Sequence, residues 1–128
     1  MPMPDTLENP HQWADKARRV ERMFDRIART YTLVNSVISF GQDAGWRRRA
    51  VRMADPLPGD RLLDVCCGPG EFADAFAAHD PPPARVVGLD FSAGMIAMAR
   101  QRQRRRDHPF ELIQGDALQL PFEDERFD

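Results

Sequence analysis

The chain has 128 residues, a length that accommodates one domain or part of one. Its composition, 42% hydrophobic and 30% charged, is typical of globular proteins, and no uninterrupted apolar run approaches the roughly 20 residues that span a bilayer. The net charge of −2 combines a basic segment 1–54 with an acidic segment 55–128, and the arginines are spread along helix-like stretches, so nucleic-acid binding is not expected.

The N-terminal segment lacks the basic head and apolar stretch of a secretory signal, so we expect a cytoplasmic protein with at most peripheral contact to a membrane. From Trp13 the apolar residues recur in steps of three and four, which predicts an amphipathic helix that reaches Tyr31. The predicted packing face of this helix consists of Trp13, Ala17, Val20, Phe24, Ile27, Ala28 and Tyr31.

A second helix is predicted to begin near Asp43, whose carboxylate can cap it, and to end before the Pro-rich turn at 56–60. Its inward positions are predicted to be Trp46, Ala50 and Met53. We therefore expect residues 1–55 to form a helical cap segment.

After residue 60 the pattern alternates between strands and helices. Strand patterns cover 61–66, 85–89 and 110–114, and helical patterns cover 71–79 and 93–106, where the arginines at the helix end are expected to be solvated. This order predicts an open α/β sheet of parallel strands, and such sheets bind ligands beyond the carboxyl ends of their strands. The segments after Val65, Leu89 and Ile113 are therefore the expected binding elements.

Each of these three strand ends carries residues suited to a nucleoside. Gly68 and Gly70 allow a sharp turn and a close approach of ligand to the backbone. Asp90 follows 20 residues after Gly70, the separation at which an acid reaches ribose hydroxyls, and Asp116 can accept the exocyclic amine of adenine. Turn glycines, a helix cap and an acidic turn residue are the plainer alternatives. The glycine turn, Asp90 and Asp116 follow three successive strands in this order, and that combination favours a nucleoside site over the plainer alternatives.

An NAD-type site is an alternative on the glycine turn alone. Gly68, Gly70 and Ala73 satisfy the spacing G-x-G-x-x-G/A of that fingerprint. The residues after the third strand do not suit an NAD-dependent oxidoreductase.

The strand-end segments 63–70, 87–95 and 115–117, the last with 120–122 and 127–128, resemble the motifs of class I methyltransferases in the form found in ubiquinone/menaquinone C-methyltransferases. Residues 23–28, 37–41 and 46–47, with Tyr31 and Asn35, are similar to the N-terminal signature of the same family. The resemblance covers nearly all of residues 20–128. It implies a Rossmann-like, doubly wound, mostly parallel sheet, of which the chain supplies the N-terminal helices and the first three strands and ends at the fourth.

The resemblance also implies a role for each matched residue. Residues 56–128 are the first half of an S-adenosyl-L-methionine-binding domain in this interpretation. The implied cofactor contacts are Asp64, Gly68, Pro69 and Gly70 at the methionine end, Asp90 at the ribose, Asp116 and Ala117 at the adenine, Phe91 and Met95 as apolar walls, and Tyr31 as a closing residue. Many relatives have Thr at the position of Pro69. No metal ion is implied.

The implied activity is S-adenosyl-L-methionine-dependent C-methylation of a demethylated prenyl quinol, from demethylmenaquinol to menaquinol. No catalytic base is identified, because Asp43 and Tyr31, which lie in the segment expected near the substrate, are better explained as a helix cap and a core aromatic. The expected partners are the prenyl quinol and either further copies of the chain or a complementing methyltransferase half. The alternative is a non-catalytic subunit that binds the cofactor or pairs with a second polypeptide.

Overall fold

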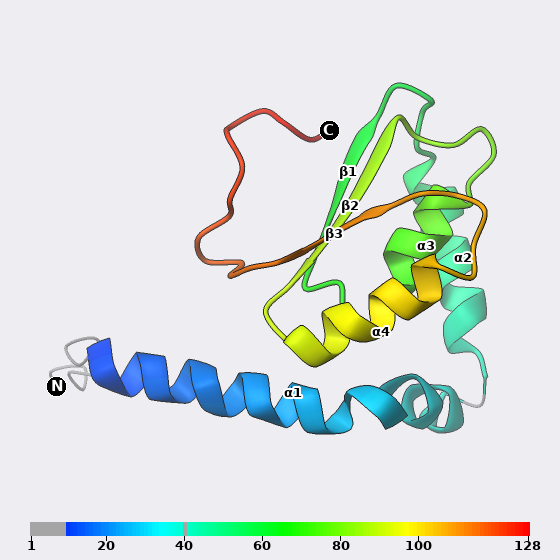
Figure 1. Ribbon diagram of the computed structural model, residues 1–128. Coiled ribbons are helices and arrows are strands. Elements are labelled where there is room, and N and C mark those ends of the chain that lie inside the picture. Colours follow the sequence, from blue (N-terminus) through cyan, green and yellow to red (C-terminus); the bar gives the residue numbers. More distant parts are fainter. Residues whose placement is uncertain (1–9, 40) are drawn as a thin grey trace, which may run out of the picture.

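The computed structural model describes residues 10–39 and 41–128 (Figure 1). Two helices, α1 (Pro10–Ile38) and α2 (Asp43–Ala54), precede an alternating unit. That unit consists of β1 (Arg61–Val65), α3 (Glu71–Ala77), β2 (Arg85–Asp90), α4 (Ala93–Gln103) and β3 (Glu111–Gln114). The predicted order of elements is confirmed, with most ends shifted by a few residues. Among the described helices, none is long and apolar enough to cross a membrane.

The three strands form one parallel sheet in the order β1-β2-β3, as the alternating pattern predicts. Val65 pairs with Leu89, and Asp90 pairs with Gln114, so the carboxyl ends of the strands meet at one edge of the sheet. The turn after β1, the turn after β2 and the segment after β3 therefore start beside one another.

Small residues bring the helices close to the sheet. One cluster of the core consists of Ala73 and Ala77 from α3, Val86 from β2 and Phe110 before β3, with Leu62, Phe76 and Leu112 packed against them. Gly70 supports this packing, because a Cβ atom at this position would lie 3.0 Å from Cβ of Ala99 on α4. Apolar burial is the main stabilising contribution of such a core.

The long helix α1 lies across the N-terminal end of α4 (Figure 1). Oδ1 of Asp25 accepts hydrogen bonds from the Ser92 hydroxyl at 2.5 Å and from the Gly94 amide at 2.9 Å. A Cβ atom at Gly94 would lie 3.0 Å from Cα of Asp25, so glycine permits the close approach of the two helices. Ala28, one turn further along α1, is buried.

The final residues return to the free edge of β1. The Asp128 amide donates to the Arg61 carbonyl at 2.8 Å, and the Arg61 amide donates to Oδ2 of Asp128 at 2.9 Å. Phe122 and Phe127 stack edge to face, with ring centroids 4.9 Å apart. The segment that leads to residue 128 therefore runs up to β1 on the side opposite β2.

The predicted packing faces of the two N-terminal helices are partly wrong. On α2, Trp46 and Met53 are 59% and 76% exposed and Ala50 is exposed, whereas Val51 is buried. On α1, Ala17, Val20 and Ile27 are exposed, while Ala28 is buried and Phe24 and Tyr31 are half-buried. The side chain of Trp13 lies outside the described residues. Both helices have a second apolar stripe, and periodicity alone does not tell which stripe faces the sheet.

Asp43 does not cap α2, contrary to the prediction. The N-cap residue is Gln42, which makes no side-chain capping bond. Asp43 instead accepts a hydrogen bond from the Ser39 hydroxyl at 3.2 Å and forms an ion pair with Arg47 at 3.2 Å. The carboxylate is occupied by these two partners, away from the strand ends.

Ion pairs, rather than an apolar stripe, join α2, α3 and α4. Glu71 of α3 lies 2.8 Å from Arg47 and 3.4 Å from Arg102, and the buried Asp74 lies 3.2 Å from both Arg106 and His108. We call these residues the paired-acid cluster. The prediction that the arginines at the end of α4 are all solvated is therefore wrong for Arg102, which is half-buried between acids of α3, whereas Arg106 pairs with Asp74 and is exposed.

Candidate functional site

A pocket of about 330 Å³ lies at the carboxyl ends of β1 and β2, and α1 forms its roof. Its floor comes from the turns after the two strands. The lining residues are Val20, Glu21, Phe24 and Tyr31 of α1, Cys66 and Gly68 after β1, and Asp90, Phe91, Ser92 and Met95 from the end of β2 to α4. The pocket thus brings together five of the residues predicted for the cofactor: Tyr31, Gly68, Asp90, Phe91 and Met95.

The turn after β1 is held in an unusual backbone conformation. Cys66, Gly68 and Gly70 have φ angles of 58°, 55° and 80°, in the left-handed region that favours glycine. No atom lies within 4 Å of where a Cβ of Gly68 would be, so this glycine is required for its backbone angle and leaves open space beside it. The sharp turn expected from the two glycines is present.

Asp90 is fixed by two backbone amides. Its Oδ2 atom accepts from the Gly68 amide at 2.8 Å, and its Oδ1 atom accepts from the Ser92 amide at 2.9 Å. Ser92, not Asp90, caps α4, since the Ser92 hydroxyl accepts from the Met95 amide at 3.2 Å. Each carboxylate oxygen can accept a further hydrogen bond. Asp90 is therefore oriented by the protein and keeps acceptor capacity for a ligand.

Asp64 is an acid without a cation. Its Oδ2 atom is buried and has no hydrogen-bond partner. The pKa of Asp64 is raised to about 6, mainly by burial and to a smaller extent by the negative charge of Asp90, while a hydrogen bond from the Ala73 amide opposes the shift. Asp64 does not line this pocket and instead lines a neighbouring one with Phe72 and Phe127. Incompletely satisfied, pKa-shifted acids are concentrated at functional sites.

The other predicted cofactor residues lie around the pocket without lining it. Pro69 and Gly70 are buried behind the turn, where the Pro69 carbonyl accepts from Nε of Arg102 at 3.1 Å. Asp116 is exposed, and its Oδ1 atom accepts from the Leu118 amide at 2.9 Å. Ala117 is half-buried.

The segment that carries Asp116 nevertheless starts next to the pocket. The Gly115 amide donates to the Asp90 carbonyl at 2.9 Å, which places the chain one residue before Asp116 beside the end of β2. A ligand that extends from Asp90 toward β3 would therefore meet this segment.

The two adjacent cysteines have different environments. Cys66 is exposed and lines the pocket, whereas Cys67 is buried against Gly88. Burial, together with the smaller effect of the nearby Asp64 and Asp90 charges, raises the pKa of the Cys67 thiol to about 12. Cys67 is therefore an unreactive packing residue. Within residues 10–39 and 41–128, no group of three or more His, Cys, Asp or Glu side chains could hold a metal ion.

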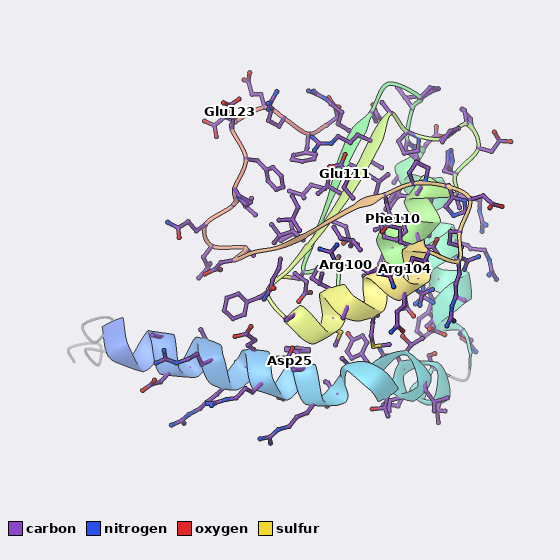
Figure 2. All side chains as sticks on the ribbon, in the orientation of Figure 1. Asp25, Arg100, Arg104, Phe110, Glu111 and Glu123 are labelled. Carbon is purple, nitrogen blue, oxygen red and sulfur yellow. The ribbon has the colours of Figure 1, made fainter. Side chains whose placement is uncertain are left out.

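Sequence reasoning predicted Tyr31 as a residue that closes the site, but it missed the other roof residues and the contact that holds the roof. Val20, Glu21 and Phe24 line the pocket together with Tyr31, and their helical spacing places them on one side of α1. Asp25 fixes this helix to Ser92 and Gly94, and Figure 2 shows Asp25 on the side of α1 that faces α4. The helical spacing of these residues could be predicted from the sequence, but the contact of α1 with α4 could not.

Comparison with known proteins gives a consistent result. The model of the ubiE/COQ5 methyltransferase family matches residues 12–128. Demethylmenaquinone methyltransferase of Bacillus cereus (strain AH187) is 40% identical over 114 residues, which are 88% of this chain and 48% of that protein. A protein of the same name from Bacillus anthracis is equally similar. The chain thus spans about half the length of the curated relatives it matches.

Solved structures agree on the fold. The YcgJ protein of Bacillus subtilis has a TM-score of 0.58 and 28% identity, covering 64% of this chain and 34% of that one. Phosphoethanolamine N-methyltransferase 1 of Haemonchus contortus, solved with phosphoethanolamine and S-adenosylhomocysteine, has a TM-score of 0.64 and 19% identity, covering 88% of this chain and 24% of that one. At that identity the second likeness concerns the fold alone, and it confirms the Rossmann-like methyltransferase fold expected from the sequence.

Proposed function

Because this chain belongs to the ubiE/COQ5 methyltransferase family, we propose that it supplies the S-adenosyl-L-methionine-binding half of an enzyme that methylates a ring carbon of a demethylated prenyl quinol. The observation that carries the proposal is the pocket above β1 and β2, with the Asp90 carboxylate in its wall. The substrate that the relatives' name indicates is demethylmenaquinol.

The pocket suits the adenosyl part of the cofactor. Asp90 is already oriented by two amides and can accept the two ribose hydroxyl groups. Phe91 supplies exposed apolar surface for a flat adenine ring, the buried Met95 adds a small part of the wall, and Phe24 and Tyr31 cover the site from α1. Asp116 and Ala117 follow Gly115 beside Asp90, where the Asp116 carboxylate can accept the exocyclic amine of the adenine.

The acids at the strand ends suit the positively charged part of the cofactor. The methionine end of S-adenosyl-L-methionine carries an ammonium group and a sulfonium centre. Asp64 has a buried oxygen without a partner, and no described cationic side chain pairs with Asp64 or Asp90. A cationic ligand at the turn formed by Gly68, Pro69 and Gly70 would reduce the repulsion between these two acids.

When bound, the cofactor supplies a methyl group that passes from sulfur to a nucleophilic carbon by in-line displacement. The part played by this chain is binding and alignment. Asp90 fixes the ribose, the glycine turn positions the methionine end, and α1 excludes water from above. The quinol ring carbon loses a proton as the new bond forms. We assign no residue of this chain as the acceptor of that proton.

The remainder of the fold is proposed to join at β1. At the edge of β1 opposite β2, the described backbone contact is the one between Asp128 and Arg61. Val65 and Phe72, beside this edge, are exposed. A further parallel strand at this edge would cover them and complete an open sheet, in which the substrate lies across the strand ends. That strand belongs to the continuation of the polypeptide or to a complementing methyltransferase half.

The activity is tested with methyl-labelled S-adenosyl-L-methionine and a demethylated naphthoquinol. The 128-residue chain is assayed alone and with the polypeptide that continues or complements it. We expect label in the quinol only when the second part is present, and loss of that label in Asp90→Ala but not in Asp107→Ala, a change at an exposed acid remote from the pocket. Transfer by the chain alone would overturn the half-enzyme proposal. Absence of transfer in every mixture, despite bound quinol, would overturn the activity.

A further inference from the structure

The side of α1 that faces away from the sheet carries two parallel rows of exposed side chains. One row is aliphatic, and its members are 37% to 71% exposed: Met23, Ile27, Val34, Val37 and Ile38. The other row is basic and consists of Arg19, Arg22 and Arg26, all exposed. Apart from the adjacent Val37 and Ile38, each row follows steps of three, four or seven residues, so each forms a stripe along the helix. We call the two rows together the outer face of α1.

The two rows meet in one groove. Arg19, Arg22 and Arg26 line a groove of about 350 Å³ together with Met23 and Ile27. Arg18, in the preceding turn, pairs with Asp15 at 2.6 Å, whereas the three arginines of the groove form no ion pair with any described residue. Figure 2 shows nitrogen-tipped side chains that extend from this helix away from the sheet. The groove thus combines three arginines with an apolar wall, and Asp15 offsets part of the charge of Arg19 and Arg22.

We infer that the outer face of α1 binds the surface of an anionic lipid bilayer. A helix with an aliphatic stripe beside a row of arginines lies in the membrane interface, with its apolar side chains below the headgroups and its cations at the phosphates. Charge complementarity favours this occupant. An acidic protein would satisfy the three arginines but would leave the aliphatic row exposed, and an apolar protein surface would bury the arginines without partners.

The inference rests on the proposed function and adds to it where the substrate comes from. The adjoining side of α1 forms the roof of the pocket through Glu21, Phe24 and Tyr31, so one helix would contact both the bilayer and the cofactor. A prenyl quinol is apolar and partitions into the bilayer. Binding of α1 to the membrane surface would hold the pocket about one helix diameter, roughly 10 Å, from the bilayer that contains the quinol.

The test is flotation of the complete protein with lipid vesicles. One vesicle population contains phosphatidylcholine alone, and the other contains about 30% phosphatidylglycerol, each at about 0.1 M and about 0.5 M salt. We expect the protein to float with the anionic vesicles at low salt, less at high salt, and not with phosphatidylcholine alone. The aliphatic and basic rows are tested separately, with Met23→Ser/Ile27→Ser and with Arg22→Glu/Arg26→Glu.

Each double variant should lower the partition coefficient by about tenfold or more, because either the inserted aliphatic groups or the phosphate contacts are lost. The matched control is Arg104→Glu/Arg105→Glu, an equal charge change at exposed arginines after α4, which should stay within about twofold of the unchanged protein. Circular dichroism of every variant establishes that the helix content is retained.

Three outcomes would overturn the inference: no binding to anionic vesicles, an equal loss in the control, or a protein complex that covers the outer face of α1 and dissociates in Met23→Ser/Ile27→Ser. Calorimetry of S-adenosyl-L-methionine binding in the same samples separates this from the proposed function. Cofactor binding without vesicle binding refutes the membrane surface alone, and vesicle binding without cofactor binding refutes the proposed function alone.

Discussion

The acids of α3 and the acids at the strand ends lie in one α/β unit but differ in their partners: the first pair with cationic side chains, and the second do not. Asp74 lies 3.2 Å from Arg106 and 3.7 Å from Arg102, so its charge is neutralised inside the paired-acid cluster. Asp64 and Asp90 are held by backbone amides and have no described cationic partner, and Asp90 raises the pKa of Asp64. The first group of acids stabilises the packing of helices. The second keeps negative charge available for a ligand, at a cost in stability.

The two regions are nevertheless connected. Arg102 pairs with Glu71 and donates through Nε to the Pro69 carbonyl, so the paired-acid cluster supports the glycine turn from behind. Within this glycine turn, the Gly68 amide donates a hydrogen bond to Asp90. The neutralised acids therefore hold the backbone on which the unneutralised acids are displayed.

The largest effect on stability is expected for Asp74→Asn. The change removes the only buried carboxylate of the paired-acid cluster and leaves Arg102 and Arg106 without that partner. We expect the free energy of unfolding to fall by about 2–3 kcal/mol, at or below the lower end of the range for a buried pair because the arginines are partly exposed. Urea denaturation measures it. If Asp74→Asn lowered the free energy of unfolding no more than Asp107→Asn, a change at an exposed acid, the acids of α3 would not stabilise the packing of the helices.

A change of opposite sign is expected for Asp64→Asn. The folded-state pKa of Asp64, about 6, lies above its ordinary value of 3.8, so the folded chain binds more protons than the unfolded chain between about pH 4 and pH 6. The stability contributed by this group is present at pH 4 and is lost as the pH rises through 6. Without ligand at pH 7.5, Asp64→Asn should therefore be more stable by about 1–3 kcal/mol.

The comparison of pH profiles is the control for Asp64→Asn. The variant and the unchanged protein should have similar unfolding free energies at pH 4 and diverge toward pH 7.5, while the variant binds S-adenosyl-L-methionine more weakly. A variant that is less stable at pH 7.5 would contradict the view that the carboxylate of Asp64 is costly without ligand.

A smaller effect is expected for Asp25→Asn, which weakens the contact between the pocket roof and α4. The hydrogen bonds of Oδ1 with the Ser92 hydroxyl and the Gly94 amide lose their charge assistance, for a loss of about 1 kcal/mol. Asp15→Asn is the matched control on the same helix, because its pair with Arg18 is exposed and should contribute less than the contacts of Asp25. Thermal unfolding measures both. Equal effects would show that Asp25 does not hold α1.

The fold was predictable because each strand is bounded by turn residues and alternates with a helical pattern. Leu62, Val86 and Leu112 occupy strand positions that local composition identifies, and Gly68 and Asp90 occupy strand ends where parallel sheets bind ligands. The sequence was therefore sufficient to predict that Gly68, Asp90, Phe91 and Met95 lie near one edge of the sheet.

The packing of the helices was not predictable in the same way. The side of α1 that carries Phe24 and Ala28 packs on α4, and the competing stripe with Met23 and Ile27 is exposed. Choosing between two apolar stripes requires the position of the partner. Ion pairs between distant segments, such as Arg47 with Glu71, depend on the same long-range arrangement, and local periodicity contains no signal for them.

The most direct test of the strand-end acids is the affinity of S-adenosyl-L-methionine for the complete protein and for Asp90→Ala, measured by titration calorimetry. Loss of a charged acceptor of ribose hydroxyls should cost about 1.5–3 kcal/mol, or about 10- to 150-fold in affinity, while Asp107→Ala binds as the unchanged protein does. Equal affinities of Asp90→Ala and the unchanged protein, with the fold intact, would contradict the assignment of the strand-end pocket as the cofactor site.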